Sequence, residues 1–317
     1  MFDSWSDHDI PDLTRRVAVV TGGNGGLGLA TCRALVAAGA HVVMAARNQE
    51  KAEAAAADVE ARGGPGTVEI VPLDLADLDS VKEAAAAIRA RHVALDLLVN
   101  NAGIMGVGYG ETAQGFEQQF GTNHLGHFAL TAQLLPALLT RSGSRIVMVT
   151  SVARFRTAPL DAPTSGSEGY DPWQAYGRSK LANHVFAQEL HRRLRAAGAG
   201  TASLSAHPGL TNSDLQTTSV EMSGGGSSQK FFQRLAHRIG MTVERGALSQ
   251  LRAATDRSAR SGELYGPRFV SVGSPVRRPT LDRKIEDRGM ALWKVSEEAI
   301  GLTFDVAAQV AANNASS

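Results

Sequence analysis

The segment YGRSK places Tyr176 and Lys180 four residues apart, with small or polar residues between them. On a helix this spacing puts both side chains on one face, one turn apart. A free tyrosine has a pKa of about 10, too high for an efficient base at neutral pH, but a nearby cation favours the phenolate. The pair therefore fits a proton-transfer device in which Lys180 lowers the pKa of Tyr176; a solvated helix face is the alternative.

A glycine-rich turn, TGGNGGLG, joins an apolar run at 16–23 to a helical pattern at 27–40. Gly22, Gly26 and Gly28 follow the pattern T-G-x-x-x-G-x-G. Glycine permits positive φ and a close backbone approach to a pyrophosphate, which the positive end of a helix attracts. Because the turn lies between a strand and a helix, it predicts a dinucleotide site rather than a merely tight turn.

The next apolar run, 41–47, ends at Arg47 in the segment MAARNQE. An NAD-binding protein of this type carries an acidic residue about 20 residues after the turn, which accepts the ribose 2′-hydroxyl. A guanidinium in that place would instead pair with a 2′-phosphate. We therefore expect NADP(H) as the cofactor, with NAD the less favoured alternative. Glu50, further along, fits the following helix better.

Apolar runs and helical patterns alternate along the chain. The runs predict strands at 16–23, 41–47, 67–75, 94–103, 144–151, 201–209 and 264–270. The helical patterns cover 27–40, 49–62, 79–91, 112–140, 173–197, 243–255 and 291–302. Apolar strands without a polar face, alternating with helices, form parallel sheets covered on both faces. We predict one Rossmann-type α/β domain over 1–317, a doubly wound parallel sheet of about seven strands with helices on both faces.

Active sites in open α/β sheets lie at the carboxyl ends of the strands. The glycine turn, NNAG, Ser151 and HPG each follow a predicted strand, so we expect them at one edge of the sheet. Two long loops, 154–172 and 210–240, are expected to border the substrate. The core would span about 15–270, and the extension 271–317 would pack back on it, with only the final NNASS fitting a disordered tail.

The composition is that of a soluble globular protein, with 43% hydrophobic residues, 20% charged residues and a formal net charge of +1. This balance gives no reason to expect a nucleic-acid partner or an anionic membrane surface. The one cysteine, Cys32, cannot form an intrachain disulfide and is expected to be buried. No apolar run approaches the ~20 residues of a membrane span, and the N-terminus does not resemble a signal peptide. We expect a cytoplasmic protein without a membrane partner.

Seven segments together resemble the short-chain dehydrogenase/reductase family, in the family's order. They are TGGNGGLG, LDL (73–75), NNAG (100–103), TNHLGHF (122–128), VTS (149–151), YGRSK (176–180) and HPG (207–209). NHLGHF and the early DIPDL look closest to the branch of the retinol dehydrogenases and WW-domain oxidoreductases. The resemblance covers about residues 15–215.

The resemblance implies a set of residues that bind the cofactor. Asp74 would contact the adenine amine, with the Leu75 amide beside it. A wall of three residues after the fourth strand would lie behind the adenine ribose. Ser213 would lie near the nicotinamide carboxamide. The full set is Gly22, Asn24, Gly26, Leu27, Gly28, Arg47, Asp74, Leu75, Asn100, Ala102, Gly103, Tyr176, Lys180, Pro208, Gly209 and Ser213.

The resemblance also implies four catalytic residues. Asn123 would hold a water in a proton relay, Ser151 would hydrogen-bond the substrate carbonyl, and Tyr176 would exchange the proton with Lys180 as its partner. Ser151 and Tyr176 are 25 residues apart, longer than in compact members of the family, so substrate preference does not carry over. The implied reaction is hydride transfer between nicotinamide and a small carbonyl or alcohol substrate, with a homodimer or homotetramer as the assembly.

Two other functions remain open at this point. A catalytically silent, cofactor-binding regulatory protein would keep the fold without turnover, and an epimerase or dehydratase would use the same scaffold without net redox change. His124 and His127 have the i, i+3 spacing of a metal pair, but no further ligands complete a site, and we expect no metal. Trp173, Phe155 and Phe231 would line an apolar substrate pocket or anchor loops.

Overall fold

A computed structural model of the chain describes residues 4–155, 160, 166–211, 240–280 and 284–316. The strands are β1 (Val17–Thr21), β2 (His41–Ala46), β3 (Thr67–Pro72), β4 (Leu97–Asn100), β5 (Arg145–Val149), β6 (Ala202–Ala206), β7 (Leu264–Pro267) and β8 (Pro275–Arg278). The helices are α1 (Gly26–Ala37), α2 (Gln49–Ala61), α3 (Leu78–Arg91), α4 (Gln118–Phe120), α5 (Gly126–Leu139), α6 (Pro172–Ala196), α9 (Val243–Thr255), α10 (Ile285–Ile300) and α11 (Val306–Ser316). Three single turns complete the described elements: η1 (Asp7–Asp9), the π-helical η2 (Gly121–Leu125) and η3 (Val152–Phe155).

Within the described ranges, eight strands form one sheet in the order β3-β2-β1-β4-β5-β6-β7-β8. The first seven are parallel, and Val19 on β1 pairs with Val43 on β2 and Leu98 on β4. The strand order reverses between β1 and β4, which is where doubly wound sheets bind ligands. The predicted Rossmann-type fold is confirmed. The prediction of about seven strands omitted β8, which pairs antiparallel with β7 at the edge of the sheet.

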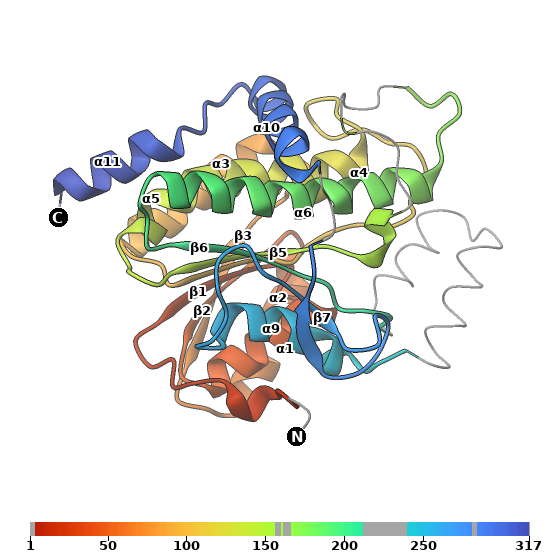
Figure 1. Cartoon of the computed structure of the whole chain (residues 1–317). Helices are drawn as coiled ribbons and strands as arrows, with labels where there is room; N and C mark the ends of the chain where they lie inside the picture. Colours follow the sequence, from red (N-terminus) through yellow and green to blue (C-terminus); the bar gives the residue numbers. More distant parts are fainter. Residues whose placement is uncertain (1–3, 156–159, 161–165, 212–239, 281–283, 317) are drawn as a thin grey trace.

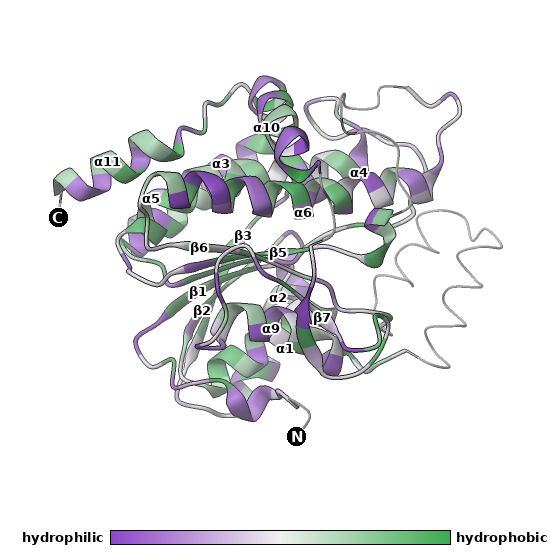
Figure 2. Cartoon of the chain, in the orientation of Figure 1, coloured by the Kyte–Doolittle hydropathy of each residue, from purple (hydrophilic) through white to green (hydrophobic). Residues whose placement is uncertain are grey.

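Both faces of the sheet are buried, and each has its own apolar core. Val19 and Val43 pack into one core with α3, α5 and α6, whereas Val20 and Val42 pack into the other with α1, α2 and α9. Figure 1 shows these helices as layers above and below the strands, and Figure 2 shows the central strands as largely hydrophobic. Burial on both faces explains why the strands are apolar throughout rather than alternating.

The C-terminal extension packs on the domain, as the sequence predicted. Trp293 on α10 stacks on Phe304 with ring centroids 4.8 Å apart, and Phe128 on α5 meets the Trp293 ring edge-on at 5.1 Å. Both aromatic residues of the extension are almost fully buried. The expectation of a disordered NNASS end is wrong for residues 313–316, because α11 continues through them.

The predicted single helix over 112–140 is interrupted. The described chain forms the short α4, then one π-helical turn, and then α5. The π turn covers Gly121–Leu125, and α5 begins at Gly126. Gly126 lies so close to the main chain of Leu75 that a Cβ atom on it would collide with the Leu75 carbonyl oxygen. Single π turns inside helices are frequent at functional sites, and this one carries Asn123.

Two further expectations from the sequence concern single features. Cys32 is buried in α1, and burial raises the pKa of its thiol to about 12. Over the described residues, none of the helices combines the length and the apolar character that crossing a membrane requires.

Candidate functional site

The glycine turn between β1 and α1 has the close geometry that the sequence predicted. Gly22 has a φ of +65°, a conformation that favours glycine, and a Cβ atom on Gly28 would collide with the Gly22 carbonyl oxygen. Gly26 begins α1, and Asn24 and Leu27 on either side of it are partly exposed. The turn therefore leaves the amino terminus of α1, with its free N–H groups, open to an anion.

Thr21 locks this turn to the loop after β4. Its hydroxyl oxygen accepts hydrogen bonds from the amides of Asn101 (2.9 Å) and Ala102 (3.0 Å), and the Asn101 side chain donates to the Thr21 carbonyl at 2.9 Å. Gly22 is pressed against Ala102, where a Cβ atom would approach to 3.1 Å. The glycine turn and the loop after β4, both predicted to bind the cofactor, are thus joined side by side where the strand order reverses.

The Asn100 side chain lies beneath the loop that the family resemblance assigns to the adenine ribose. It is fully buried and donates to Thr131 on α5 at 2.9 Å, so it is not on the open surface of the loop. The residues after it, Asn101, Ala102 and Gly103, are partly exposed. Any wall behind a ribose is therefore formed by these residues and by main-chain atoms, and the Asn100 side chain anchors the loop from below.

Arg47 and Asp74 lie near each other at the carboxyl ends of β2 and β3. Their closest nitrogen and oxygen atoms are 3.8 Å apart, and the Arg47 side chain is 68% exposed. An exposed pair at this distance contributes little stability, so the guanidinium is available to a ligand. The Asp74 carboxylate also accepts from the Ala76 amide at 2.9 Å, and the Leu75 side chain is buried.

The HPG segment after β6 is held against the turn between β7 and β8. Gly209 has a φ of +72°, and a Cβ atom there would collide with the Ser271 carbonyl oxygen. The Pro208 carbonyl accepts from the Thr211 hydroxyl at 3.1 Å. His207 is buried and burial lowers its pKa to about 3, so it is a neutral packing residue at neutral pH. Ser213 lies outside the described residues, as does most of the predicted loop at 210–240.

Tyr176, Ser151 and Lys180 come together at the same edge of the sheet. Tyr176 lies in the first turns of α6, whose start is capped by the Asp171 side chain, and the Ser151 side chain lies close enough to its hydroxyl to lower its pKa. The Lys180 ammonium lies 5.8 Å from the centre of the Tyr176 ring and donates to the Val149 carbonyl at 3.3 Å. The helical spacing and the strand end that the sequence pointed to therefore do bring these three side chains together.

Burial dominates the acid–base properties of this group. It raises the pKa of Tyr176 to about 12, although the neighbouring Ser151 hydroxyl acts to lower it, and it lowers the pKa of Lys180 to about 8. The prediction that Lys180 brings the pKa of Tyr176 below its usual value is therefore wrong for the cofactor-free protein. The Lys180 ammonium lies 5.8 Å from the centre of the Tyr176 ring, and its charge does not offset the loss of water around that ring.

Asn123 connects the loop after β4 to α6. Its amide nitrogen donates to the Ile104 carbonyl and to the Ser179 hydroxyl, both at 2.9 Å, and its amide oxygen accepts from the Ile104 N–H at 2.8 Å. A Cβ atom on Gly103 would approach the Asn123 amide oxygen to 2.9 Å and the Lys180 ammonium to 3.2 Å. Asn123 and Lys180 thus both lie against Gly103, at the place where a side chain would be.

His127 is a site residue whose role the sequence reasoning missed. It is fully buried, with Nδ1 2.9 Å from the Asn123 carbonyl oxygen and Nε2 2.9 Å from the Thr21 hydroxyl. Because a carbonyl only accepts, Nδ1 carries the proton and Nε2 accepts from Thr21. Burial lowers the pKa of His127 to about 4, so the ring is neutral. The sequence contains one sign of this role. His127 lies four residues after Asn123, and on a helix its side chain can reach back to the Asn123 carbonyl.

His124 does not form a metal pair with His127. Its Nε2 atom lies 2.9 Å from the Ser296 hydroxyl, which connects the π turn to α10. The ring packs between Phe120 and Phe186, with centroid distances of 5.0 and 6.0 Å. Burial lowers its pKa to about 3, which fits a neutral core histidine.

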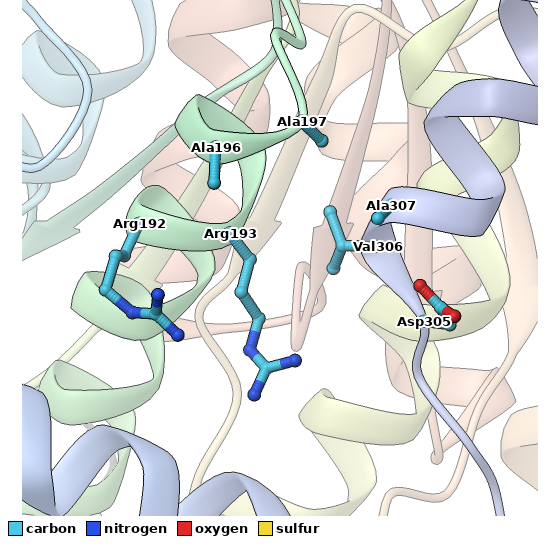
Figure 3. Close-up of a pocket in the computed structure, with 7 residues that line it drawn as sticks. All are labelled: Arg192, Arg193, Ala196, Ala197, Asp305, Val306 and Ala307. Carbon is cyan, nitrogen blue, oxygen red and sulfur yellow. The ribbon is translucent and has the colours of Figure 1, made fainter.

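A pocket of about 180 Å³ lies elsewhere, between the end of α6 and the start of α11 (Figure 3). Arg192 lies 16 residues after Tyr176 on α6, which is about 24 Å along the helix. Both Arg192 and Arg193 bind the Glu189 carboxylate at 2.7 Å. Both guanidinium groups are therefore ion-paired with a residue of α6 itself. The pocket is separate from the site at the sheet edge.

Comparison with known proteins finds a family and close relatives. The family model described as short chain dehydrogenase matches residues 16–224. Retinol dehydrogenase 11 of Homo sapiens is 36% identical over 296 residues, covering 92% of this chain and 88% of its own. The dehydrogenase/reductase SDR family member 13 of Bos taurus is 36% identical over 304 residues, covering 92% of this chain and 75% of its own.

Solved structures are also similar. An uncharacterized protein from Mycobacterium Paratuberculosis superposes with a TM-score of 0.77 at 38% identity, covering 95% of this chain and 99% of its own. A short chain dehydrogenase from Burkholderia cenocepacia in complex with NADP superposes with a TM-score of 0.63 at 25% identity, covering 83% of this chain and 99% of its own.

Proposed function

The chain belongs to the short-chain dehydrogenase/reductase family, in its retinol-dehydrogenase-like branch, and we propose that it is an NADP(H)-dependent reductase of an apolar carbonyl compound. Family membership makes it an oxidoreductase that acts on alcohol or carbonyl groups. The observation that carries the proposal further is the convergence of three side chains: the Ser151 hydroxyl acts on the Tyr176 phenol, and the Lys180 ammonium lies 5.8 Å from the centre of the same ring.

The residues at the sheet edge fit a dinucleotide. The contact of Gly28 with the Gly22 carbonyl leaves no room for a side chain, so a pyrophosphate would meet only backbone N–H groups at the start of α1. Gly103 likewise has no room for a side chain, because the Asn123 amide oxygen and the Lys180 ammonium lie 2.9 and 3.2 Å from where its Cβ atom would be. When bound, NADPH supplies a hydride, and NADP⁺ accepts one in the reverse direction.

The protein side of the reaction is a proton transfer at the Tyr176 hydroxyl. Ser151 holds the substrate oxygen beside Tyr176, and the phenol gives its proton to that oxygen as the carbonyl is reduced. With a pKa of about 12, Tyr176 is fully protonated at neutral pH and is ready to act as the acid. Oxidation of an alcohol would need the phenolate, so carbonyl reduction is the direction that the protonated Tyr176 assists near neutral pH.

The preference for NADP(H) rests on Arg47. Its guanidinium is 68% exposed at the end of β2 and its nearest carboxylate, Asp74, is 3.8 Å away on β3. A 2′-phosphate offers several acceptors to a planar guanidinium, whereas a 2′-hydroxyl offers much weaker contacts. The charge balance at this edge therefore favours the phosphorylated cofactor.

An apolar substrate is supported by the rings around the site. Trp173 meets the Tyr176 ring edge-on at 6.4 Å, and Phe155 and Phe269, in the segments after β5 and β7, are 70% and 71% exposed. Phe155 lies four residues after Ser151, and Phe269 lies two residues before Ser271, whose carbonyl oxygen faces Gly209. Since several relatives are named retinol dehydrogenases, retinal and other bulky aldehydes come first among the compounds to test.

The test is NADPH consumption by purified protein across a panel of aldehydes, ketones and quinones, with retinal included. We expect saturable NADPH-dependent turnover of at least one bulky apolar carbonyl. Tight NADPH binding with no turnover of any compound would instead support the catalytically silent regulatory protein. Product formation from a cofactor that shows no net redox change would support an epimerase or dehydratase.

A further inference from the structure

Two histidines and a glutamate converge at the opposite, amino-terminal edge of the sheet. His41 begins β2, Glu69 lies in the neighbouring β3, and His92 directly follows α3. One potential ligand atom from each lies within 4.8 Å of the other two. Arg47 follows His41 by six residues along β2, so this cluster is about 20 Å from the candidate cofactor site.

The His41 ring gives the strongest evidence that the cluster is built for a cation. Its Nδ1 atom lies 2.7 Å from the Thr67 hydroxyl, and its Nε2 atom is buried without a hydrogen-bond partner. The Nε2 atom is 3.7 Å from a Glu69 carboxylate oxygen, too long for a hydrogen bond. With the proton on Nδ1, a nitrogen lone pair faces a carboxylate, and a cation between them would satisfy both.

His92 completes a three-ligand set. Its Nε2 atom lies 2.7 Å from the same Glu69 oxygen that faces His41. The carboxylate only accepts, so this nitrogen carries a proton that metal binding would displace. The hydrogen bond from His41 to Thr67 is the kind of outer contact that fixes the tautomer of a metal-bound histidine.

One positive charge faces the cluster. Arg91 lies 3.6 Å from the other Glu69 oxygen, on the side away from the histidines, and its side chain is 52% exposed. Water screens the Arg91 charge at that exposure. The Glu69 oxygen that both histidines face therefore remains available to a cation.

We propose that His41, Glu69 and His92 form a binding site for a divalent transition metal of the zinc type. Two imidazoles and one carboxylate suit Zn²⁺ and Co²⁺ rather than Mg²⁺ or Ca²⁺, and the fourth position would hold water. The metal would clamp β2 and β3 to the end of α3. It would act on stability, because the site lies at the edge of the sheet that the reaction does not use.

The test uses full-length protein treated with a chelator and then titrated with Zn²⁺ by calorimetry. We expect one metal per chain, a rise in the melting temperature, and, with Co²⁺ in place of Zn²⁺, the visible absorption of a four-coordinate ion. Glu69→Gln and His92→Gln should weaken binding more than about a hundredfold. His191→Gln, which removes a partly buried histidine bonded to Ser261 outside the cluster, is the matched control and should change nothing.

Thr67→Val removes the hydrogen bond that fixes the His41 tautomer and keeps all three metal ligands. It should weaken Zn²⁺ binding about tenfold or more. This exposed position accepts valine without loss of a core contact, so failure to fold is not expected. Absence of saturable Zn²⁺ and Co²⁺ binding to the native protein would overturn the proposal and leave a hydrogen-bonded ion pair only. Equal binding by the native protein and the Glu69→Gln variant would overturn it as well.

Discussion

Lys180 is buried where its own charge is unfavourable, so the fold should gain stability when that charge is removed. Its side chain is 4% exposed, and burial lowers its pKa from 10.5 to about 8. A fall of this size corresponds to about 3 kcal/mol for keeping the ammonium charged in the folded, cofactor-free protein at neutral pH. The folded protein would lose this stability because the candidate site needs a charged Lys180 in a buried place.

Lys180→Met keeps the length of the side chain and removes the charge. The variant loses the 3.3 Å hydrogen bond to the Val149 carbonyl, which is about 1 kcal/mol. That carbonyl still accepts from the Asn183 side chain at 3.2 Å, so it is not left without a partner. We expect a net gain of about 2 kcal/mol in the free energy of unfolding at pH 7, together with loss of turnover.

The gain should depend on pH in a defined direction. Between pH 8 and 10.5 the unfolded chain keeps the Lys180 proton while the folded chain has lost it. Because the unfolded state then binds more protons, the native protein becomes more stable relative to the variant as the pH rises. The advantage of the variant is complete below pH 8 and shrinks above it.

Urea unfolding of the cofactor-free proteins, followed by circular dichroism between about pH 7 and about pH 9.5, measures this difference. Lys294→Met on α10 is the control, since that lysine is 78% exposed and should change the free energy of unfolding by less than about 0.5 kcal/mol. A Lys180→Met variant that is less stable than the native protein at pH 7 would refute the reasoning. So would a stability difference that stays constant across this range.

Three other predictions concern the site and the extension. Ser151→Ala should lower turnover about a hundredfold or more. It should also move the rising limb of the oxidation pH profile to higher pH, because the Ser151 hydroxyl that lowers the Tyr176 pKa is lost; an unchanged steady-state profile contradicts this. Arg47→Asp should weaken NADPH binding about 10- to 100-fold with little effect on NADH binding. Equal NADPH affinity of the variant and the native protein by fluorescence titration would contradict the pairing of Arg47 with the 2′-phosphate. Trp293→Ala should cost about 3–5 kcal/mol in urea unfolding, because the ring is 2% exposed; a loss below about 1 kcal/mol would mean that the extension is not part of the core.

The sheet was predictable because its central strands are buried on both faces and are therefore apolar throughout. β8 was missed for the converse reason: it is a short edge strand, PVRR, whose proline and arginines do not resemble a buried run. The break at 121–125 was also missed, because the glycines there lie inside an apolar helical pattern. Gly121 faces Thr112 and Gly126 faces the Leu75 carbonyl oxygen, and these close contacts exist only in the folded protein.

The candidate site was predictable where chemistry is concentrated in short motifs. YGRSK identified two side chains that the structure brings together, and the glycine turn identified a close backbone contact between Gly22 and Gly28. Reasoning from charge alone gave the wrong direction for the pKa of Tyr176, because burial can be judged only from the fold. The link from Thr21 through His127 to the π turn spans 106 residues and has no motif. The His41 cluster is spread over β2, β3 and the end of α3 and was invisible for the same reason.

The central claim is that the Tyr176 hydroxyl supplies the proton, and Tyr176→Phe tests it most directly. The experiment compares NADPH consumption by the native protein and the variant with a carbonyl compound that the native protein reduces, and NADPH affinity by fluorescence titration. We predict a loss of turnover of about 10²- to 10⁴-fold with NADPH affinity changed less than about twofold, because the ring and its packing remain. Turnover within about tenfold of the native rate would contradict the assignment.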